Sequence, residues 1–114
     1  MTVLDTVHEH VAAFNARDLD RVVALFAEDA VFANPDQLVV GRRGLRALFA
    51  DAFAQPVTAT LELHRAVVEG ESAACELTEA LVADGGRVEL GLAVFYTVRA
   101  GALVRVRIYR DVSA

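Results

Sequence analysis

Three polar side chains stand within apolar stretches of the sequence, where they can do chemistry that their neighbours cannot. His10 lies at the edge of an apolar helical stripe, three residues after Val7 and four before Phe14. Asn34 follows a short apolar run and precedes a proline. Glu79 interrupts an apolar row that has the spacing of a strand.

A histidine titrates near neutral pH and can act as a general acid or base. A carboxyl group in an apolar row either has a raised pKa and a function or is paired with another buried group, because an unpaired buried carboxylate is unfavourable. A carboxamide both donates and accepts, so Asn34 can orient a water or a substrate oxygen. We therefore predict a catalytic group of His10, Asn34 and Glu79, in which Glu79 or His10 exchanges the proton.

Each of these residues also has a purely structural interpretation. His10 can be a solvated residue on the flank of its helix, and Asn34 before a proline is an ordinary turn signal. A shift of one residue in the strand would turn Glu79 towards solvent. The residue pattern leaves both interpretations open at these positions.

The first half of the chain must supply the helices, because apolar residues recur there at spacings of three and four. The first helix starts after Thr2, with Asp5 in the place of a capping-box acid. Asp18 is a good N-cap for a second helix. A third helix follows Gly41 and ends at Gln55, which precedes a proline.

Strands make up the rest of the chain. A short strand is expected at 30–33, and after the third helix the pattern changes to a period of two. Four strands joined by tight turns then predict an antiparallel meander over about 57–69, 72–83, 87–99 and 102–111. Alternation on the last strand turns one set of side chains inward (Val104, Val106 and Ile108) and another outward (Arg105, Arg107 and Tyr109).

We predict an α+β fold in which a single domain, residues 1–114, packs three N-terminal helices on one face of a curved antiparallel sheet. A cone-shaped cavity opens where the helices cover the sheet incompletely. Aromatic residues at helical spacing usually belong to the core. Three of them, Phe14, Phe49 and Phe53, are here expected to line the cavity and bind substrate, together with Tyr96 on the inward face of the third long strand.

Composition narrows the class of function. The net charge of −5 argues against binding of nucleic acid. The single cysteine, Cys75, cannot form an intramolecular disulfide and has no neighbour at a metal-ligand spacing. No run reaches the roughly 20 apolar residues of a membrane span. We expect a soluble, cytoplasmic protein that uses neither a metal nor an organic cofactor.

Three segments carry a family resemblance: "ARDLDRVVALFAEDAVFANP", "GRRGLRALFADAF" and the closing "VRIYRD". They resemble the SnoaL-like group of the nuclear-transport-factor-2-like (NTF2-like) superfamily, and the resemblance covers almost the whole chain. It implies the NTF2-like cone. Members include ketosteroid isomerases, limonene-type epoxide hydrolases, polyketide cyclases, dehydratases and non-catalytic domains, so fold alone does not supply the function.

The signatures of the best-known activities are not intact. The resemblance implies that the general-base aspartate of a ketosteroid isomerase matches Asn34, which cannot accept a proton at neutral pH. The tyrosine of its oxyanion hole matches His10. The Arg-x-Asp pair of the epoxide hydrolases matches Leu77 and Glu79, which keeps the carboxyl group and loses the arginine, and their partner aspartate matches Ile108.

We expect an enzyme that carries out cofactor-independent acid/base chemistry on a hydrophobic small molecule, as an isomerase, cyclase, dehydratase or epoxide hydrolase. The alternative is a non-catalytic ligand-binding or dimerisation domain of the same fold. In either case we expect a homodimer that forms through the outer face of the sheet, where Arg105, Arg107 and Tyr109 lie.

Overall fold

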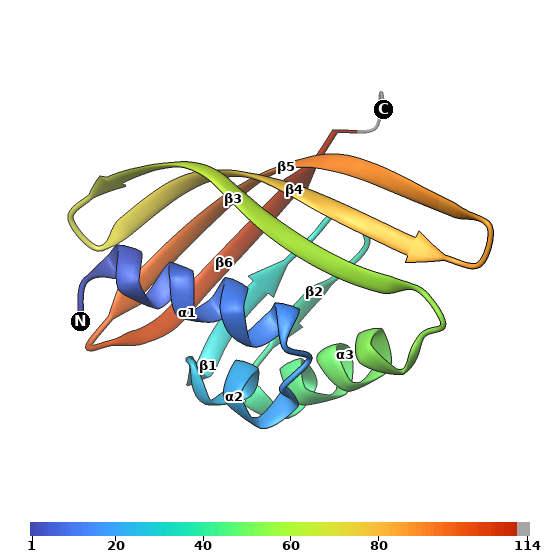
Figure 1. Ribbon diagram of the computed structural model, residues 1–114. Coiled ribbons are helices and arrows are strands. Elements are labelled where there is room, and N and C mark those ends of the chain that lie inside the picture. The colour runs from blue at the N-terminus through green and yellow to red at the C-terminus, as the bar shows by residue number, and fades with distance from the viewer. Residues whose placement is uncertain (112–114) are drawn as a thin grey trace.

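The computed structural model describes residues 1–111, which form three helices and one six-stranded sheet (Figure 1). In chain order the elements are α1 (Val3–Asn15), α2 (Leu19–Ala24), β1 (Phe26–Ala33), β2 (Leu38–Val40), α3 (Arg42–Ala54), β3 (Thr58–Glu69), β4 (Ser72–Ala83), β5 (Gly86–Arg99) and β6 (Ala102–Arg110). No helix in this part of the chain has the length and apolarity needed to cross a membrane.

The strands are arranged in the order β2-β1-β6-β5-β4-β3. Strands β3 to β6 form the predicted antiparallel meander, with ends within one residue of those expected. The strand β1 differs, because it pairs in parallel with β6 and places Phe32 beside Val106. The sheet is therefore mixed, and the prediction of a wholly antiparallel sheet was wrong at this edge.

The strand β1 also begins four residues earlier than predicted, at Phe26. Its register against β6 shifts between Phe26 and Val31, and Glu28 and Asp29 in this irregular stretch are exposed. A bulge of this kind removes the period-two alternation by which a strand is recognised. The short strand β2 was not predicted, since its three residues are too few to show any alternation.

Of the three helices within residues 1–111, α2 has only six residues, so α1 and α3 provide most of the cover over the inner face of the sheet (Figure 1). The predicted caps are confirmed. Thr2 Oγ1 accepts a hydrogen bond from the backbone N of Asp5 at 3.1 Å, and the Asp5 carboxylate accepts from the backbone N of Thr2 at 2.8 Å. Asp18 caps α2 by accepting from the backbone N of Arg21 at 3.2 Å.

The core lies between the helices and the inner face of the sheet. On β6 Val106 is fully buried and Ile108 is half-buried, as predicted. The next core position is held by Leu103 and not by Val104, because the register of β6 against β5 shifts at this point and leaves one residue unpaired. The outward set is exposed as predicted: Arg105, Arg107 and Tyr109.

A side chain at the end of α1 attaches this helix to the free edge of the sheet. Asn15 donates from Nδ2 to the backbone O of Leu61 at 2.9 Å and accepts at Oδ1 from the backbone N of Leu61 at 2.7 Å. Leu61 pairs with Glu79 on β4, and both of its backbone groups point away from that strand. Asn15 therefore makes the two hydrogen bonds with β3 that a neighbouring strand would otherwise make at this position. They hold α1 against the sheet beside Glu79.

We expect Asn15→Ala to lower the free energy of unfolding by about 1–2 kcal/mol, because two backbone groups of β3 lose their partner. Asn15→Asp keeps the acceptor and loses the donor, so it should show an intermediate effect. Urea denaturation followed by circular dichroism measures both. An alanine variant as stable as the wild type would contradict this account of the edge strand.

Candidate functional site

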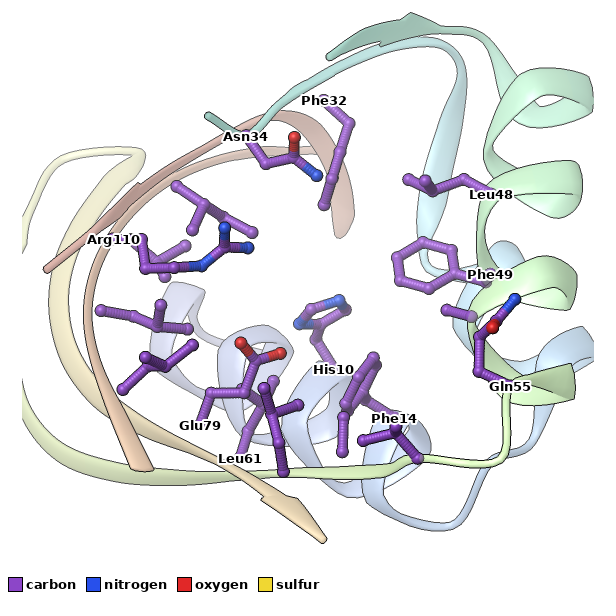
Figure 2. Close-up of a pocket in the computed structure, with 18 of the residues that line it drawn as sticks. His10, Phe14, Phe32, Asn34, Leu48, Phe49, Gln55, Leu61, Glu79 and Arg110 are labelled. Atoms are coloured by element: carbon purple, nitrogen blue, oxygen red, sulfur yellow. The ribbon is translucent and has the colours of Figure 1, made fainter. Parts of the chain in front are cut away.

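A cavity of about 400 Å³ lies between α1, α3 and the inner face of the sheet (Figure 2). Most of its wall is apolar. The aliphatic and aromatic lining includes Phe14, Phe32, Leu48, Phe49, Leu61, Leu81, Leu90, Leu92, Val94 and Ile108. A wall of this kind is suited to an apolar molecule, whose surface it would remove from water.

The structure brings most of the predicted site residues to this one cavity. His10, Asn34, Glu79 and the predicted aromatic residues Phe14, Phe49 and Tyr96 all line it. Phe53 does not. Its ring packs against Phe14 at 5.5 Å and Phe49 at 6.2 Å between centroids, and the guanidinium group of Arg17 covers it. Phe53 lies one helical turn beyond Phe49, so it supports the lining from behind.

His10 is 4% exposed and projects from α1 into the cavity (Figure 2). Its Nδ1 lies 3.3 Å from the hydroxyl oxygen of Tyr96 on β5. The rings of Phe26, Phe49 and Tyr96 pack edge-on around the imidazole. Because burial disfavours the charged form, the pKa of His10 falls to about 4, so the imidazole is neutral at pH 7.

The second nitrogen of His10 is available to a ligand. Nε2 is buried and has no hydrogen-bond partner among residues 1–111. Burial also raises the pKa of Tyr96, whose hydroxyl group therefore keeps its proton. When Tyr96 donates that proton to Nδ1, the imidazole carries its own proton on Nε2 and can donate one hydrogen bond into the cavity.

Glu79 reaches the cavity from β4, as the alternation predicted (Figure 2). Its side chain is half-buried, and this burial raises the pKa of the carboxyl group. The positive charge of Arg110 acts in the opposite direction but does not cancel the effect of burial. Glu79 therefore keeps its proton to a higher pH than an ordinary glutamate and can exchange it with a bound molecule.

The side chain of Asn34 has two separate roles, one for each end of its amide. Oδ1 accepts hydrogen bonds from the backbone N of Asp36 at 2.9 Å and of Gln37 at 3.0 Å, and so forms the turn between β1 and β2. Nδ2 points towards the cavity (Figure 2). The turn interpretation is therefore confirmed by the oxygen, while the nitrogen remains a donor at the cavity wall and its predicted role in orienting a ligand stays a prediction.

The sequence analysis missed Arg110, which lines the cavity from the end of β6. Its Nε is buried and has no acceptor in the part of the chain that the structure describes. One of its terminal nitrogens lies 3.6 Å from the carboxylate of Asp36 at the rim. The signal was present, since the alternation that turns Val106 and Ile108 inward continues to residue 110.

Gln55, which was interpreted only as the end of the third helix, also lines the cavity. Nothing in its sequence context indicated this position, because the last turn of α3 is brought to the cavity by tertiary packing. No group of three or more His, Cys, Asp or Glu side chains within residues 1–111 is arranged to hold a metal ion.

Comparison with known proteins agrees with this architecture. The family described as "SnoaL-like domain" matches residues 7–106. The chain belongs to this family. The SnoaL-like resemblance seen in the sequence is thus confirmed, together with the NTF2-like fold of the solved structures that are similar to it.

Among those structures, an LEH-like epoxide hydrolase from M. tuberculosis is 25% identical with a TM-score of 0.86, over 96% of this chain and 83% of that chain. An uncharacterised cystatin-fold protein from Novosphingobium aromaticivorans is 27% identical with a TM-score of 0.84, over 96% and 99% of the two chains. A hypothetical protein with a ketosteroid isomerase-like fold from Catenulispora acidiphila, solved with trimethylamine, is 17% identical with a TM-score of 0.87, over 99% and 89%. The last likeness shows the fold alone.

The lowered pKa of His10 makes stability depend on pH. The unfolded chain binds a proton near the ordinary histidine pKa of 6.5 and the folded chain only near 4, so the stabilisation is complete above pH 6.5 and is lost as pH falls towards 4. We expect this residue to remove about 2 kcal/mol of unfolding free energy between pH 7 and pH 5. In His10→Gln that loss should be absent, as measured by the difference between the two proteins in urea denaturation at each pH. An NMR titration that places the His10 midpoint near 6.5 would contradict the assignment.

Proposed function

We propose that this SnoaL-like protein is an enzyme that carries out cofactor-independent acid/base chemistry on a hydrophobic small molecule. The observation that supports this most directly is the Glu79 carboxyl group, which has a raised pKa and opens onto an apolar cavity that also holds the unpaired Nε2 of His10. The reactions of this type are isomerisation, cyclisation, dehydration and the opening of an epoxide.

In this proposal Glu79 is the residue that exchanges the proton. A carboxyl group with a raised pKa stays protonated to a higher pH than an ordinary glutamate, so it can protonate a leaving or ring oxygen of the substrate, and the carboxylate it leaves can then take a proton back. His10 is neutral and a poor acid at pH 7, so its part is to donate a hydrogen bond from Nε2 to a substrate oxygen. Asn34 orients a second oxygen or a water through Nδ2.

The apolar wall binds the body of the substrate and excludes water from the reacting atoms. Phe14 and Phe49 lie on the helical side of the cavity, and Leu92 lies on the sheet side. Exclusion of water strengthens the hydrogen bonds made in the cavity and favours the protonated form of Glu79. The similarity to an epoxide hydrolase makes epoxides a natural set of first substrates beside ketones.

The outer face of the sheet supports a second proposal, that the protein forms a homodimer through this face. Phe95 and Tyr109 are both 50% exposed and pack edge-to-face at 5.9 Å between centroids. The guanidinium carbon of Arg107 lies 5.3 Å from the centre of the Tyr109 ring. A groove beside them also contains Arg105 and Val67. Exposed aromatic and arginine side chains of this kind are enriched in protein interfaces.

The catalytic proposal is tested by turnover of a panel of hydrophobic epoxides and ketones, followed by mass spectrometry. We expect Glu79→Gln to lower kcat by about 100- to 10,000-fold on any substrate found, because it removes the exchangeable proton and keeps the shape of the side chain. Glu76→Gln is the matched control, since Glu76 lies on the same strand with its side chain 67% exposed. Ligands that bind without turnover, or a Glu79→Gln variant of full activity, would favour the non-catalytic alternative.

The dimer is tested by light scattering at micromolar concentration, where we expect the mass of two chains. Phe95→Glu should produce a monomer, because it removes one of the two exposed rings and places an acidic charge in the proposed contact. Val82→Glu serves as the control, since Val82 is also exposed but lies outside this groove. A wild-type protein that is monomeric under these conditions would exclude the proposal.

A further inference from the structure

The cavity contains one side chain whose charge does not depend on pH, the guanidinium group of Arg110. Its titratable or charged lining residues come one from each of four elements: His10 on α1, Glu79 on β4, Tyr96 on β5 and Arg110 on β6. The lining residues of α3, β1 and β3 are uncharged. Burial disfavours the charged forms of His10, Glu79 and Tyr96, whereas the guanidinium group of Arg110 keeps its charge throughout the pH range in which proteins are stable.

Arg110 also lacks a full set of acceptors. Its Nε is buried without an acceptor among residues 1–111. A terminal nitrogen of the guanidinium group forms an ion pair with the Asp36 carboxylate at 3.6 Å. The Asp36 side chain is 76% exposed, so water screens this pair and it adds little. A buried N–H group of a cation that has no acceptor is unfavourable, and a ligand that supplies an acceptor relieves this penalty.

A second donor lies at the same end of the cavity. The register of β1 against β6 pairs Ala33 with Arg107, so the turn that follows β1 lies beside the end of β6. In this turn the oxygen of Asn34 is occupied by two backbone N–H groups, which leaves Nδ2 as the group that faces the cavity. Figure 2 shows the guanidinium group of Arg110 directed into the cavity on the side of Asn34.

From these observations we propose that Arg110 and Asn34 form a carboxylate-binding subsite, so that the preferred ligand is an apolar molecule that carries one carboxylate group. Arg110 donates from Nε to one carboxylate oxygen, and Asn34 donates from Nδ2. The apolar part of the ligand lies against Phe49 and Leu92. The inference deepens the proposed function by naming the substrate class, and it rests on that function only in taking this cavity as the ligand site.

The subsite also affects Glu79. An ionised Glu79 competes with the ligand for the charge of Arg110, so the ligand carboxylate binds best when Glu79 is protonated. Binding above the pKa of Glu79 therefore takes up a proton, and the affinity falls as the pH rises through that pKa. The bound state then holds a protonated carboxyl group beside the ligand, which is the form that donates a proton.

The test compares 2-naphthoate with 2-naphthamide, two probes of nearly the same shape that differ in charge. The chain contains no tryptophan, so the fluorescence of the naphthalene ring reports binding directly. We expect the carboxylate to bind about tenfold more tightly than the amide at pH 7, as a charge-assisted hydrogen bond implies. In Arg110→Gln the two affinities should agree within about twofold, with amide binding retained.

Arg99→Gln is the matched control, because it removes the same charge from an arginine whose side chain is 65% exposed and lies outside the cavity. It should keep the tenfold preference for the carboxylate. Arg110→Lys keeps the charge and loses the Nε donor, so it should keep only part of the preference for the carboxylate. If circular dichroism shows that Arg110→Gln does not fold, Arg110→Lys takes its place in the test. Glu79→Gln should bind 2-naphthoate more tightly than the wild type, and the fall in affinity that ionisation of Glu79 causes in the wild type as the pH rises should be absent.

Equal affinity of the wild type for the two probes, or a preference that survives in Arg110→Gln, would overturn the carboxylate subsite while leaving the cavity as a ligand site. Absence of binding by either probe would overturn both the subsite and the cavity assignment. A preference that depends on Arg110 in a protein that turns over no substrate would establish the subsite and refute the catalytic proposal, so the two failures are distinguishable.

Discussion

The length of the strands relative to the helices is the constraint from which the site follows. With 14 residues at about 3.3 Å each, β5 is roughly 46 Å long when measured along its curve, whereas the 13 residues of α1 extend only about 20 Å. Two helices of that length cannot cover the whole inner face of such a sheet. Figure 1 shows the hairpin of β4 and β5 extending past them, and Val82 and Val88 near its tip are exposed. The cavity lies between the fully covered part and this tip.

The apolar lining of the cavity then determines the protonation states of the polar groups that the cavity contains. One cause, removal from water, lowers the pKa of His10 and raises those of Glu79 and Tyr96. In each case the neutral form is favoured. The Tyr96 hydroxyl group and His10 Nδ1 also form a hydrogen bond between the sheet and the helix. A histidine can therefore replace an aliphatic residue among the rings of Phe26 and Phe49 without bringing a charge into the core.

The regular parts of the fold, and the site residues they carry, could be predicted because they depend on local periodicity. The alternation of apolar residues predicted the bounds of β3 to β6 within one residue and predicted that Glu79 faces inward. The helical spacing predicted that His10 lies at the border of the apolar stripe of its helix. Alternation failed in the first half of β1, since a bulge is decided by the pairing partner. Arg110 was missed because an arginine near the end of a strand is usually solvated. The role of Gln55 could not be found, because only the packing of α3 against the sheet brings it to the cavity.

The amide at position 34 has a specific consequence for the electrostatics of the cavity. An aspartate would also accept the hydrogen bonds from Asp36 and Gln37, so the turn alone does not require asparagine. The aspartate would, however, turn its second oxygen towards the cavity and provide Arg110 with a counterion inside the protein. The asparagine places a neutral donor there instead. Arg110 and Asn34 then present N–H groups to the same space, and apart from an ionised Glu79 the acceptor that would complete them is the carboxylate of the proposed ligand.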